Sequence, residues 1–150
     1  MAEDSTAEIE GVALKLLAAR EHSRLELGRK LRARGFSDDA VDAVLERLTA
    51  VGALDESRLA ELYVAERVRK GFGPLRIRAE LAEKGLPDAL IDPHLNDRAA
   101  EWPQLLAAAH DRRFGPCVSS DRTDYARRGR FLEQRGFPAE MIRRYLRWND

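Results

Sequence analysis

The chain has few of the residues that build disulfide frameworks, membrane spans or metal centres. Its 150 residues include one cysteine, Cys117, which excludes an intramolecular disulfide and fits a reducing compartment. No apolar run approaches the roughly 20 residues of a transmembrane helix. The first residues are acidic, which is untypical of a signal peptide. We therefore expect a cytoplasmic protein without membrane contact.

The motifs of common enzyme classes are missing too. The sequence contains no Walker loop, no dinucleotide-binding glycine fingerprint and no serine elbow. His22, His94 and His110 are scattered and have no cysteine or carboxylate at metal-ligand spacing. We therefore expect no catalytic residues, no metal and no cofactor, and predict surface or helix-packing roles for the histidines.

A formal net charge of zero hides an uneven distribution of charge. Residues 36–66 hold eight acids and two arginines, a net of −6. Residues 67–84 hold six bases and two acids, a net of +4, and residues 122–147 hold eight arginines and three acids, a net of +5. Charged surfaces of opposite sign are expected along the chain.

The strongest positive feature is a helical unit written three times. Its copies are Leu31-x3-Gly35-Phe36-Ser37-x3-Val41-x3-Leu45, Leu81-x3-Gly85-Leu86-Pro87-x3-Ile91-x3-Leu95 and Leu132-x3-Gly136-Phe137-Pro138-x3-Ile142-x3-Leu146. The glycines recur with a period of about 50 residues, the range typical of repeat architectures. Such repeats form extended surfaces more readily than catalytic pockets.

The first copy shows the physics of the unit. Gly35 can end a helix in the left-handed conformation that other residues avoid. Phe36 then meets Leu31 in the apolar contact of a Schellman ending, and Ser37 can cap the next helix. We expect the other two copies to repeat this helix–turn–helix arrangement as scaffold.

Nearly all of the chain predicts helix. Capping boxes at Ser5-x-x-Glu8 and Ser23-x-x-Glu26 open the first two helices. The later helices are expected at about 38–51, 55–70, 74–84, 88–98, 102–113, 122–135 and 138–148. Pro93 predicts a kink, or a late helix start, near Asp92. The fold class is therefore all-α, with three three-helix modules at 1–54, 55–98 and 99–150.

Basic side chains mark the middle helix of each module. They are Arg24, Arg29, Lys30, Arg32 and Arg34, then Arg76, Arg78 and Lys84, then Arg127, Arg128, Arg130 and Arg135. Repeated in space, these helices would present basic surfaces suited to phosphates or to an acidic protein groove. A salt-bridged, solvated face is the alternative. Sequence-specific DNA reading is less favoured, because asparagine and glutamine are scarce.

Over residues 12–148 the chain resembles the RecX family of regulatory proteins, which modulate the RecA recombinase. The most specific stretches are Leu54-Asp55-Glu56-Ser57-Arg58-Leu59-Ala60, Lys70-Gly71-Phe72-Gly73-Pro74-Leu75-Arg76-Ile77-Arg78-x-Glu80-Leu81 and Arg130-Phe131-Leu132-Glu133-Gln134-Arg135-Gly136-Phe137. The resemblance implies three tandem modules in an elongated, curved arrangement. It also implies binding in the groove of a RecA filament on single-stranded DNA. Blocked filament growth or faster disassembly would then lower ATPase, strand-exchange and coprotease activity.

We expect basic side chains to make the contacts with the filament surface or with DNA phosphate, with Lys70, Arg76 and Arg78 most favoured. The full set of candidates is Arg29, Arg32, Lys70, Arg76, Arg78, Arg127, Arg128, Arg130, Arg143 and Arg144. Two other classes of function remain open. One is a stand-alone nucleic-acid-binding module, and direct DNA binding by the regulator would be weak by comparison. The other is a helical adaptor that docks through the acidic region 36–66. A monomer is expected, because no heptad seam demands a partner.

Overall fold

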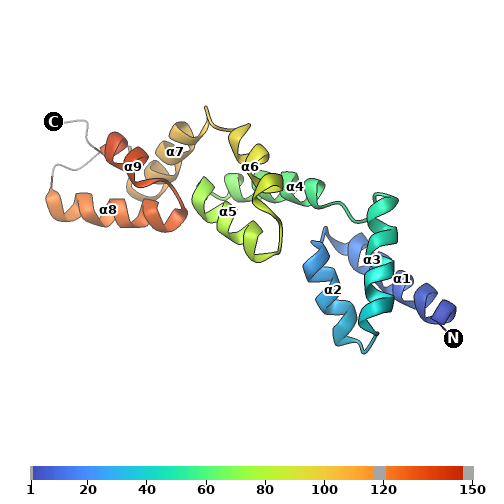
Figure 1. Cartoon of the computed structure of the whole chain (residues 1–150). Helices are drawn as coiled ribbons and strands as arrows, with labels where there is room; N and C mark the ends of the chain where they lie inside the picture. The colour runs from blue at the N-terminus through green and yellow to red at the C-terminus, as the bar shows by residue number, and fades with distance from the viewer. Residues whose placement is uncertain (1, 117–120, 147–150) are drawn as a thin grey trace.

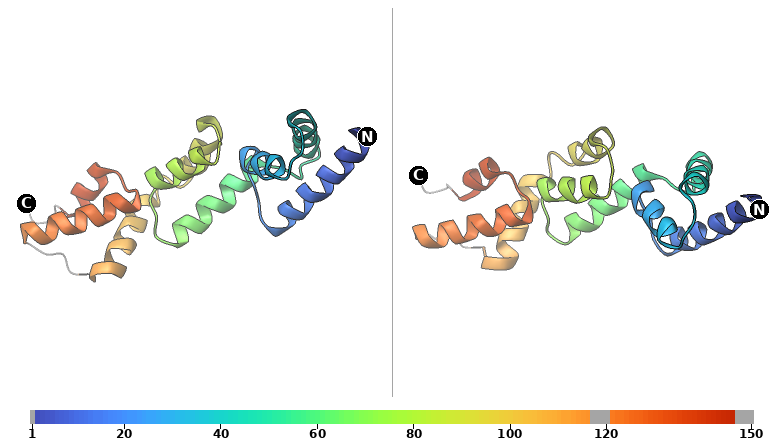
Figure 2. Two further views of the ribbon diagram at one scale, coloured as in Figure 1. Left: turned by 90° about the horizontal axis from the view of Figure 1, so that it is seen from below. Right: turned by 60° about the horizontal axis from the view of Figure 1, so that its bottom comes forward.

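The computed structural model describes residues 2–116 and 121–146, and Cys117 lies outside them. The described part is all helical, with the order α1 (Ala2–Ala19), α2 (Arg24–Ala33), α3 (Asp38–Ala50), α4 (Glu56–Arg69), α5 (Pro74–Glu83), α6 (Asp88–Asn96), α7 (Trp102–Phe114), α8 (Arg122–Arg135) and α9 (Ala139–Leu146). Figure 1 shows α1–α3, α4–α6 and α7–α9 grouped one after another along an elongated, curved molecule. We name them module 1 (α1–α3), module 2 (α4–α6) and module 3 (α7–α9). The same order along the long axis is seen in both views of Figure 2.

The repeated glycines take the predicted left-handed conformation. The φ angles are +94° at Gly35, +97° at Gly85 and +102° at Gly136. In module 3 the Phe137 N–H donates to the Leu132 carbonyl at 3.2 Å, which is the long hydrogen bond of a Schellman ending. Module 2 has its counterpart from Leu86 to Leu81 at 3.2 Å. The repeated pattern thus ends one helix and sets the path into the next.

Most predicted helix starts are confirmed. The Ser23 and Glu26 side chains form the predicted capping box of α2, and Asp55 caps α4 through the Arg58 N–H at 3.0 Å. Pro74 is the first residue of α5. The capping box predicted at Ser5 is wrong as a helix start, because α1 already begins at Ala2. Helix propagation is favourable once a turn has formed, so a capping residue does not prevent helix upstream of it.

Pro93 lies inside α6, which begins at Asp88, so the late helix start predicted near Asp92 is wrong. The ring removes one N–H donor, yet the Asp97 N–H still donates to the Pro93 carbonyl at 3.0 Å. Ile91 and Leu95 are buried on the inner face of this helix. Tertiary packing therefore holds α6 together across the proline.

Among the residues that the structure describes, the buried apolar side chains form two clusters. One lies within module 1 and includes Ile9, Leu27 and Leu45. The other runs without interruption through modules 2 and 3, from Leu59 to Leu146. The module boundaries at residues 54 and 98 stay a prediction. The two cores separate module 1 from the rest of the chain, whereas modules 2 and 3 share one core. Modules 2 and 3 thus form a continuous platform at whose junction the candidate site lies.

Candidate partner and nucleic-acid interface

The Gly71-Phe72-Gly73-Pro74 turn is the point where module 2 meets module 3. The Gly73 N–H donates to the Arg135 carbonyl at 2.7 Å, and the Leu75 N–H donates to the Gly136 carbonyl at 2.9 Å. A Cβ atom on Gly73 would lie 2.6 Å from the carbonyl carbon and oxygen of Gly136, so no larger residue fits without a shift of backbone. The break between α4 and α5 is therefore the contact surface for the repeated turn of module 3.

Three arginines surround the ring of Phe72 in this turn. The guanidinium carbons of Arg67, Arg76 and Arg135 lie 3.8, 4.5 and 4.6 Å from the ring centroid. Arg76 also donates to the Gln134 carbonyl at 3.1 Å. Cation–π attraction holds guanidinium groups in place without neutralising their charge, so the junction keeps a positive potential.

Glu80 is the carboxylate that partly balances this cluster. It accepts hydrogen bonds from Arg67 at 2.8 and 2.9 Å and from the Tyr63 hydroxyl at 3.0 Å. Burial raises the pKa of Glu80, but these hydrogen bonds outweigh burial and leave the pKa below its ordinary value. Burial and the bond to Glu80 raise the pKa of Tyr63 to about 12. Glu80 thus stays ionised and fixes Arg67, leaving Arg135 without a carboxylate of its own among the described residues.

The favoured candidates of module 2 do not lie together. Arg76 is at the junction, and Lys70 lies just before it, paired with Glu66 at 3.1 Å. Arg78 instead pairs with Asp92 at 2.9 Å and with Asp88 at 3.5 Å. Residues two apart on a helix point in different directions. The structure therefore separates Arg78 from the junction that Arg76 occupies.

In module 1 the two candidates have different surroundings. Arg29 is exposed and has no acidic partner within the described residues. Arg32 pairs with Asp38 at 2.9 Å and Asp42 at 2.8 Å, from the acidic region that follows it. The alternative of a salt-bridged face therefore describes Arg32 well, whereas Arg29 is available for a partner.

In module 3 Arg128 differs from the other candidates, because only 9% of the residue is exposed. It donates to Asp124 at 2.8 Å and to Nε2 of the buried His110 at 3.0 Å. His110 Nδ1 then faces Asp111 at 2.9 Å, as predicted for a helix-packing histidine. Arg128 is therefore part of the α7–α8 contact.

The remaining candidates of module 3 are exposed. Arg127 pairs with Asp124 at 2.5 Å. Arg144 lies 3.8 Å from Glu140. Arg130 and Arg143 have no acidic partner in the described ranges. The ten candidates are thus spread over all three modules. Sequence reasoning missed Arg67, Arg112 and Arg113 near the junction, because α4 and α7 are brought there only by tertiary packing.

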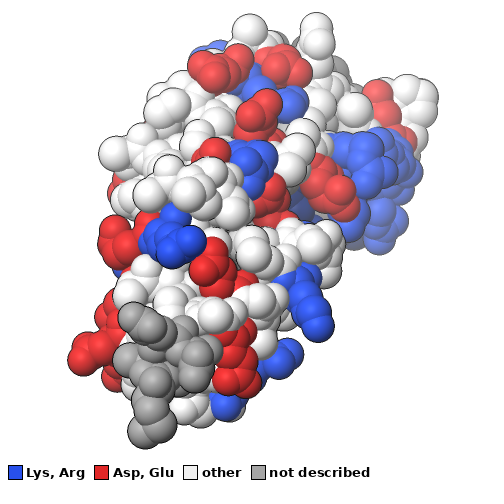
Figure 3. Space-filling view, turned by 90° about the vertical axis from the view of Figure 1, so that its right-hand side faces the viewer, with Lys and Arg blue, Asp and Glu red and all other residues white. Residues whose placement is uncertain are grey.

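The surface likewise has regions of mixed charge and a region where basic side chains gather. Seen from the end that carries module 1, acidic and basic side chains are mixed over most of the face, whereas Lys and Arg gather along one edge (Figure 3).

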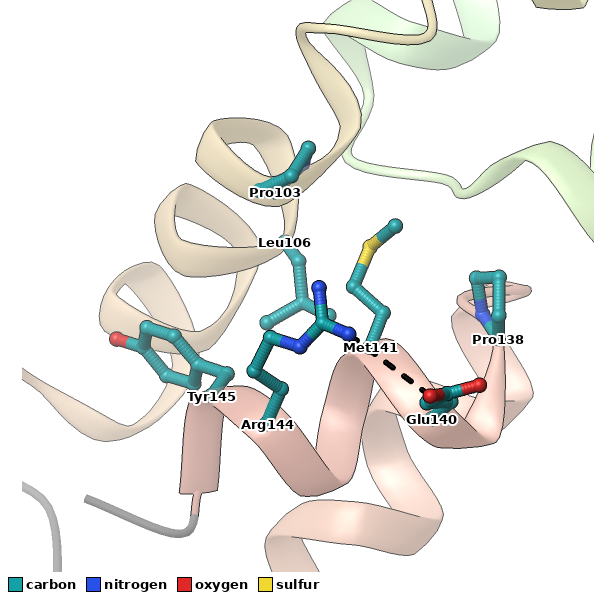
Figure 4. Close-up of a pocket in the computed structure, with 7 residues that line it drawn as sticks. All are labelled: Pro103, Leu106, Pro138, Glu140, Met141, Arg144 and Tyr145. Carbon is teal, nitrogen blue, oxygen red and sulfur yellow. Dashed lines mark ion pairs between the residues drawn. The ribbon is translucent and has the colours of Figure 1, made fainter.

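A separate, mainly apolar pocket of about 430 Å³ lies between α7 and α9. Pro103, Leu106 and Met141 line it, with the Arg144–Glu140 pair at its rim (Figure 4).

Residues 2–116 and 121–146 contain no cluster of three or more His, Cys, Asp or Glu side chains that could hold a metal ion. Within these residues no helix is long and apolar enough to cross a membrane.

The fold and its surface define an all-α repeat protein with three tandem three-helix modules and a basic junction between the second and third. Three profiles of the RecX family match the chain, described as the first, second and third three-helix domains of RecX, at residues 11–48, 55–95 and 101–146. The chain therefore belongs to the RecX family of regulatory proteins.

Individual relatives agree with this assignment. Regulatory protein RecX from Pseudomonas savastanoi pv. phaseolicola (strain 1448A / Race 6) is 43% identical over 95% of this chain and 92% of the relative. Regulatory protein RecX from Halorhodospira halophila (strain DSM 244 / SL1) is 44% identical over 90% of this chain and 84% of the relative. The crystal structure of RecX from Lactobacillus salivarius superposes with a TM-score of 0.78, covering 97% of this chain and 99% of that one, at 22% identity. The last similarity establishes the fold alone.

Proposed function

We propose that this protein binds in the helical groove of a RecA filament on single-stranded DNA and inhibits the recombinase. Binding would block filament extension or promote disassembly, and so lower ATPase, strand-exchange and coprotease activity. The observation that carries the proposal is membership of the RecX family over nearly the full chain. It acts as a cytoplasmic monomer and as a binding protein without catalysis of its own.

The shape of the protein supports this proposal. A filament repeats the same subunit surface, and an elongated protein of three modules can touch several subunits at once. Once one module is bound, the others bind at a raised effective concentration, so modest contacts combine into useful affinity. Exposed basic side chains without acidic partners in the described residues, such as Arg29 in module 1 and Arg130 in module 3, suit contacts spaced along the filament.

The test is a titration of this protein into a RecA reaction that hydrolyses ATP on single-stranded DNA. We expect inhibition at protein concentrations comparable to or below that of RecA. Charge reversal of both Arg29 and Arg130 to Glu should weaken inhibition while helix content, measured by circular dichroism, stays unchanged. The control reverses Lys15, which is also exposed and lies outside the basic middle helices. No inhibition by the unaltered protein would reject the proposal.

Arg76 and Arg78 are less suitable for reversal than the sequence suggested. Arg76 donates across the junction to Gln134, and Arg78 is held by Asp88 and Asp92. A glutamate at either position would disturb internal packing or face other carboxylates, so lost inhibition could not be assigned to the partner. Arg29 and Arg130 avoid both effects.

The second candidate function is a nucleic-acid-binding module that acts without a recombinase. The basic junction beside Phe72 favours it. Tight DNA binding by the protein alone, falling steeply with salt, together with no effect on RecA, would support this candidate over the first.

A further inference from the structure

Three phenylalanine rings near the junction are connected by shared arginines. The rings of Phe114 and Phe131 meet edge to face, with centroids 5.3 Å apart. The Arg113 guanidinium lies 5.2 Å from the Phe114 centroid and 5.8 Å from that of Phe131. Arg135 lies 5.2 Å from Phe131 and 4.6 Å from Phe72. Cations and rings thus alternate continuously from α7 and α8 to the turn before α5.

The series continues at both ends. Arg127 lies 5.0 Å from the Phe114 ring, and Arg76 lies 4.5 Å from the Phe72 ring. We call Arg127, Arg113, Arg135 and Arg76, with the three rings, the arginine ladder. Arg76, Arg113 and Arg127 are all exposed. Arg127 pairs with Asp124 at 2.5 Å and Arg76 with Glu80 at 3.4 Å, whereas Arg113 has no carboxylate partner within the described residues.

A cavity of about 110 Å³ opens beside the ladder. Its lining consists of Lys70, Gly71, Ala109, Arg112, Arg113, Phe131 and Arg135. Four of these residues are cations, and none is acidic. Arg112 and Arg113 are exposed and have no carboxylate partner within the described residues, so they differ from the salt-bridged arginines of module 1.

The electrostatics of the cavity indicate an excess of positive charge. Burial, and then the charges of Arg76, Arg112 and Arg67, lower the pKa of Arg135. Arginine nevertheless stays protonated in proteins, so the repulsion remains. An anion would relieve it, and guanidinium groups suit the oxygens of a phosphate because their donors form a planar fork.

The size of the cavity decides which part of a ligand enters it. Since water occupies roughly 30 Å³ per molecule in the liquid, the cavity has the volume of about four waters. One tetrahedral phosphate group fits that space. The ladder carries further guanidinium groups away from the cavity on both sides. Its end members Arg127 and Arg76 pair with Asp124 and Glu80, and ion pairs of exposed arginines are weak, so a phosphate can replace the carboxylate. A polymer with regularly spaced phosphates matches this arrangement better than one free anion.

A single strand matches it better than a duplex. A phosphate must enter a recess between α7 and α8, which a flexible backbone can do. Duplex DNA is stiff over about 150 base pairs and carries its phosphates on a convex cylinder. A positively charged groove that follows the backbone is typical of proteins that bind single strands.

We propose that the arginine ladder and its cavity form a track for the phosphodiester backbone of a single-stranded nucleic acid, with one phosphate seated among Lys70, Arg112, Arg113 and Arg135. The identity of the strand as the single-stranded DNA of the RecA filament rests on the proposed function. The binding itself needs no recombinase.

The test measures fluorescence anisotropy of a labelled oligo(dT) of about 12 nucleotides, within the range that single-strand sites occupy. The variant Arg112→Gln/Arg113→Gln removes two phosphate contacts and no internal ion pair. We expect binding about tenfold weaker, and a salt dependence whose log–log slope falls by about 1.4, since each contact to a single strand contributes roughly 0.7. The control Lys15→Gln/Arg47→Gln has the same net charge and should bind like the unaltered protein, because both residues are exposed and lie outside the basic middle helices.

Equal losses in the two variants, or no loss in either, would overturn the track. Two other ligands test its chemistry. An abasic strand of the same length should bind about as well as oligo(dT), because the cavity reads phosphate, and failure of the abasic strand to bind would contradict the proposal. A poly-glutamate peptide should bind far more weakly. If it bound as tightly and depended on Arg112 and Arg113, the surface would be a site for an acidic protein segment instead.

A RecA ATPase titration with the same variant separates this inference from the proposed function. Lost DNA binding with full inhibition of RecA would support the track and show that inhibition does not use it. Lost DNA binding with lost inhibition would support both the track and its use on the filament.

Discussion

Gly73 lies where the backbones of modules 2 and 3 touch. Because a Cβ at this position would lie 2.6 Å from the Gly136 carbonyl and 2.8 Å from the Phe137 nitrogen, Gly73→Ala must push backbone apart. We expect a loss of about 1–3 kcal/mol in the free energy of unfolding, the usual range for overpacking. Urea denaturation followed by circular dichroism measures it.

Gly11 supplies the control for this substitution. It lies inside α1, and a Cβ there would meet nothing within 4 Å. Alanine favours helix over glycine, so Gly11→Ala should stabilise the protein by roughly 0.5–1 kcal/mol. If both alanine variants changed stability in the same direction, close approach at Gly73 would not explain the result.

Arg127 and Arg128 both contact Asp124, but only Arg128 is buried. Arg128→Ala leaves Nε2 of His110 without its donor inside the protein, so we expect a loss of about 2–3 kcal/mol. Arg127→Ala removes an exposed pair and should cost about 0–1 kcal/mol. Thermal and urea unfolding of both variants checks this contrast. If the two variants lost similar amounts of stability, burial would not distinguish the two arginines. Arg128 would then again be a candidate for contact with a partner.

At the scale of the element, the start of α2 connects module 1 to module 2. Ser23 Oγ donates to the Lys84 carbonyl at 2.5 Å, and Lys84 Nζ lies 3.3 Å from Glu26. Burial raises the pKa of Glu26, but the hydrogen bond from the Ser23 N–H and the charge of Lys84 outweigh it, so the pKa lies below its ordinary value of 4.5. A lowered pKa in the folded state stabilises the protein above pH 4.5, and this contribution is lost as the pH falls through the folded-state value.

Glu26→Gln should therefore flatten the dependence of stability on pH below 4.5. Glutamine retains the capping-box geometry, so the substitution isolates the charge. The measurement is the urea midpoint between about pH 3 and 6, the window in which native carboxylates titrate. Glu8→Gln, an exposed carboxylate of α1, is the control. An unchanged pH profile in the Glu26 variant would show that this carboxylate does not contribute.

The same element shows which features the sequence predicts. The capping box at Ser23 and the left-handed turn at Gly85 depend on residues within six positions of one another, and both are confirmed. Burial of Arg128 depends on His110, 18 residues away on another helix. The ladder joins Phe72 to Arg135 across 63 residues. A basic middle helix could therefore be predicted from sequence, but not which of its arginines face a partner, since helix packing decides that.

At the scale of the molecule, the two apolar cores imply unequal coupling between modules. Modules 2 and 3 share one core and exchange backbone hydrogen bonds at Gly73 and Leu75. Module 1 meets module 2 mainly through polar contacts, including the Arg58–Glu21 pair and the Lys84–Glu26 pair. Exposed and half-exposed ion pairs are weak and are screened by salt. Module 1 should therefore change its angle to the rest of the molecule more easily than module 3 does.

Unequal coupling predicts that module 1 opens separately from modules 2 and 3. Leu45→Ala in the first core and Leu106→Ala in the second should each cost about 2–5 kcal/mol. Native-state hydrogen exchange read by mass spectrometry should then show faster exchange in α1–α3 for Leu45→Ala, and in both α4–α6 and α7–α9 for Leu106→Ala. Faster exchange throughout the chain in both variants would mean one cooperative unit. In the proposed complex with a filament, a separate module 1 would adjust to the helical path of the filament, while the rigid junction keeps the arginine ladder in place.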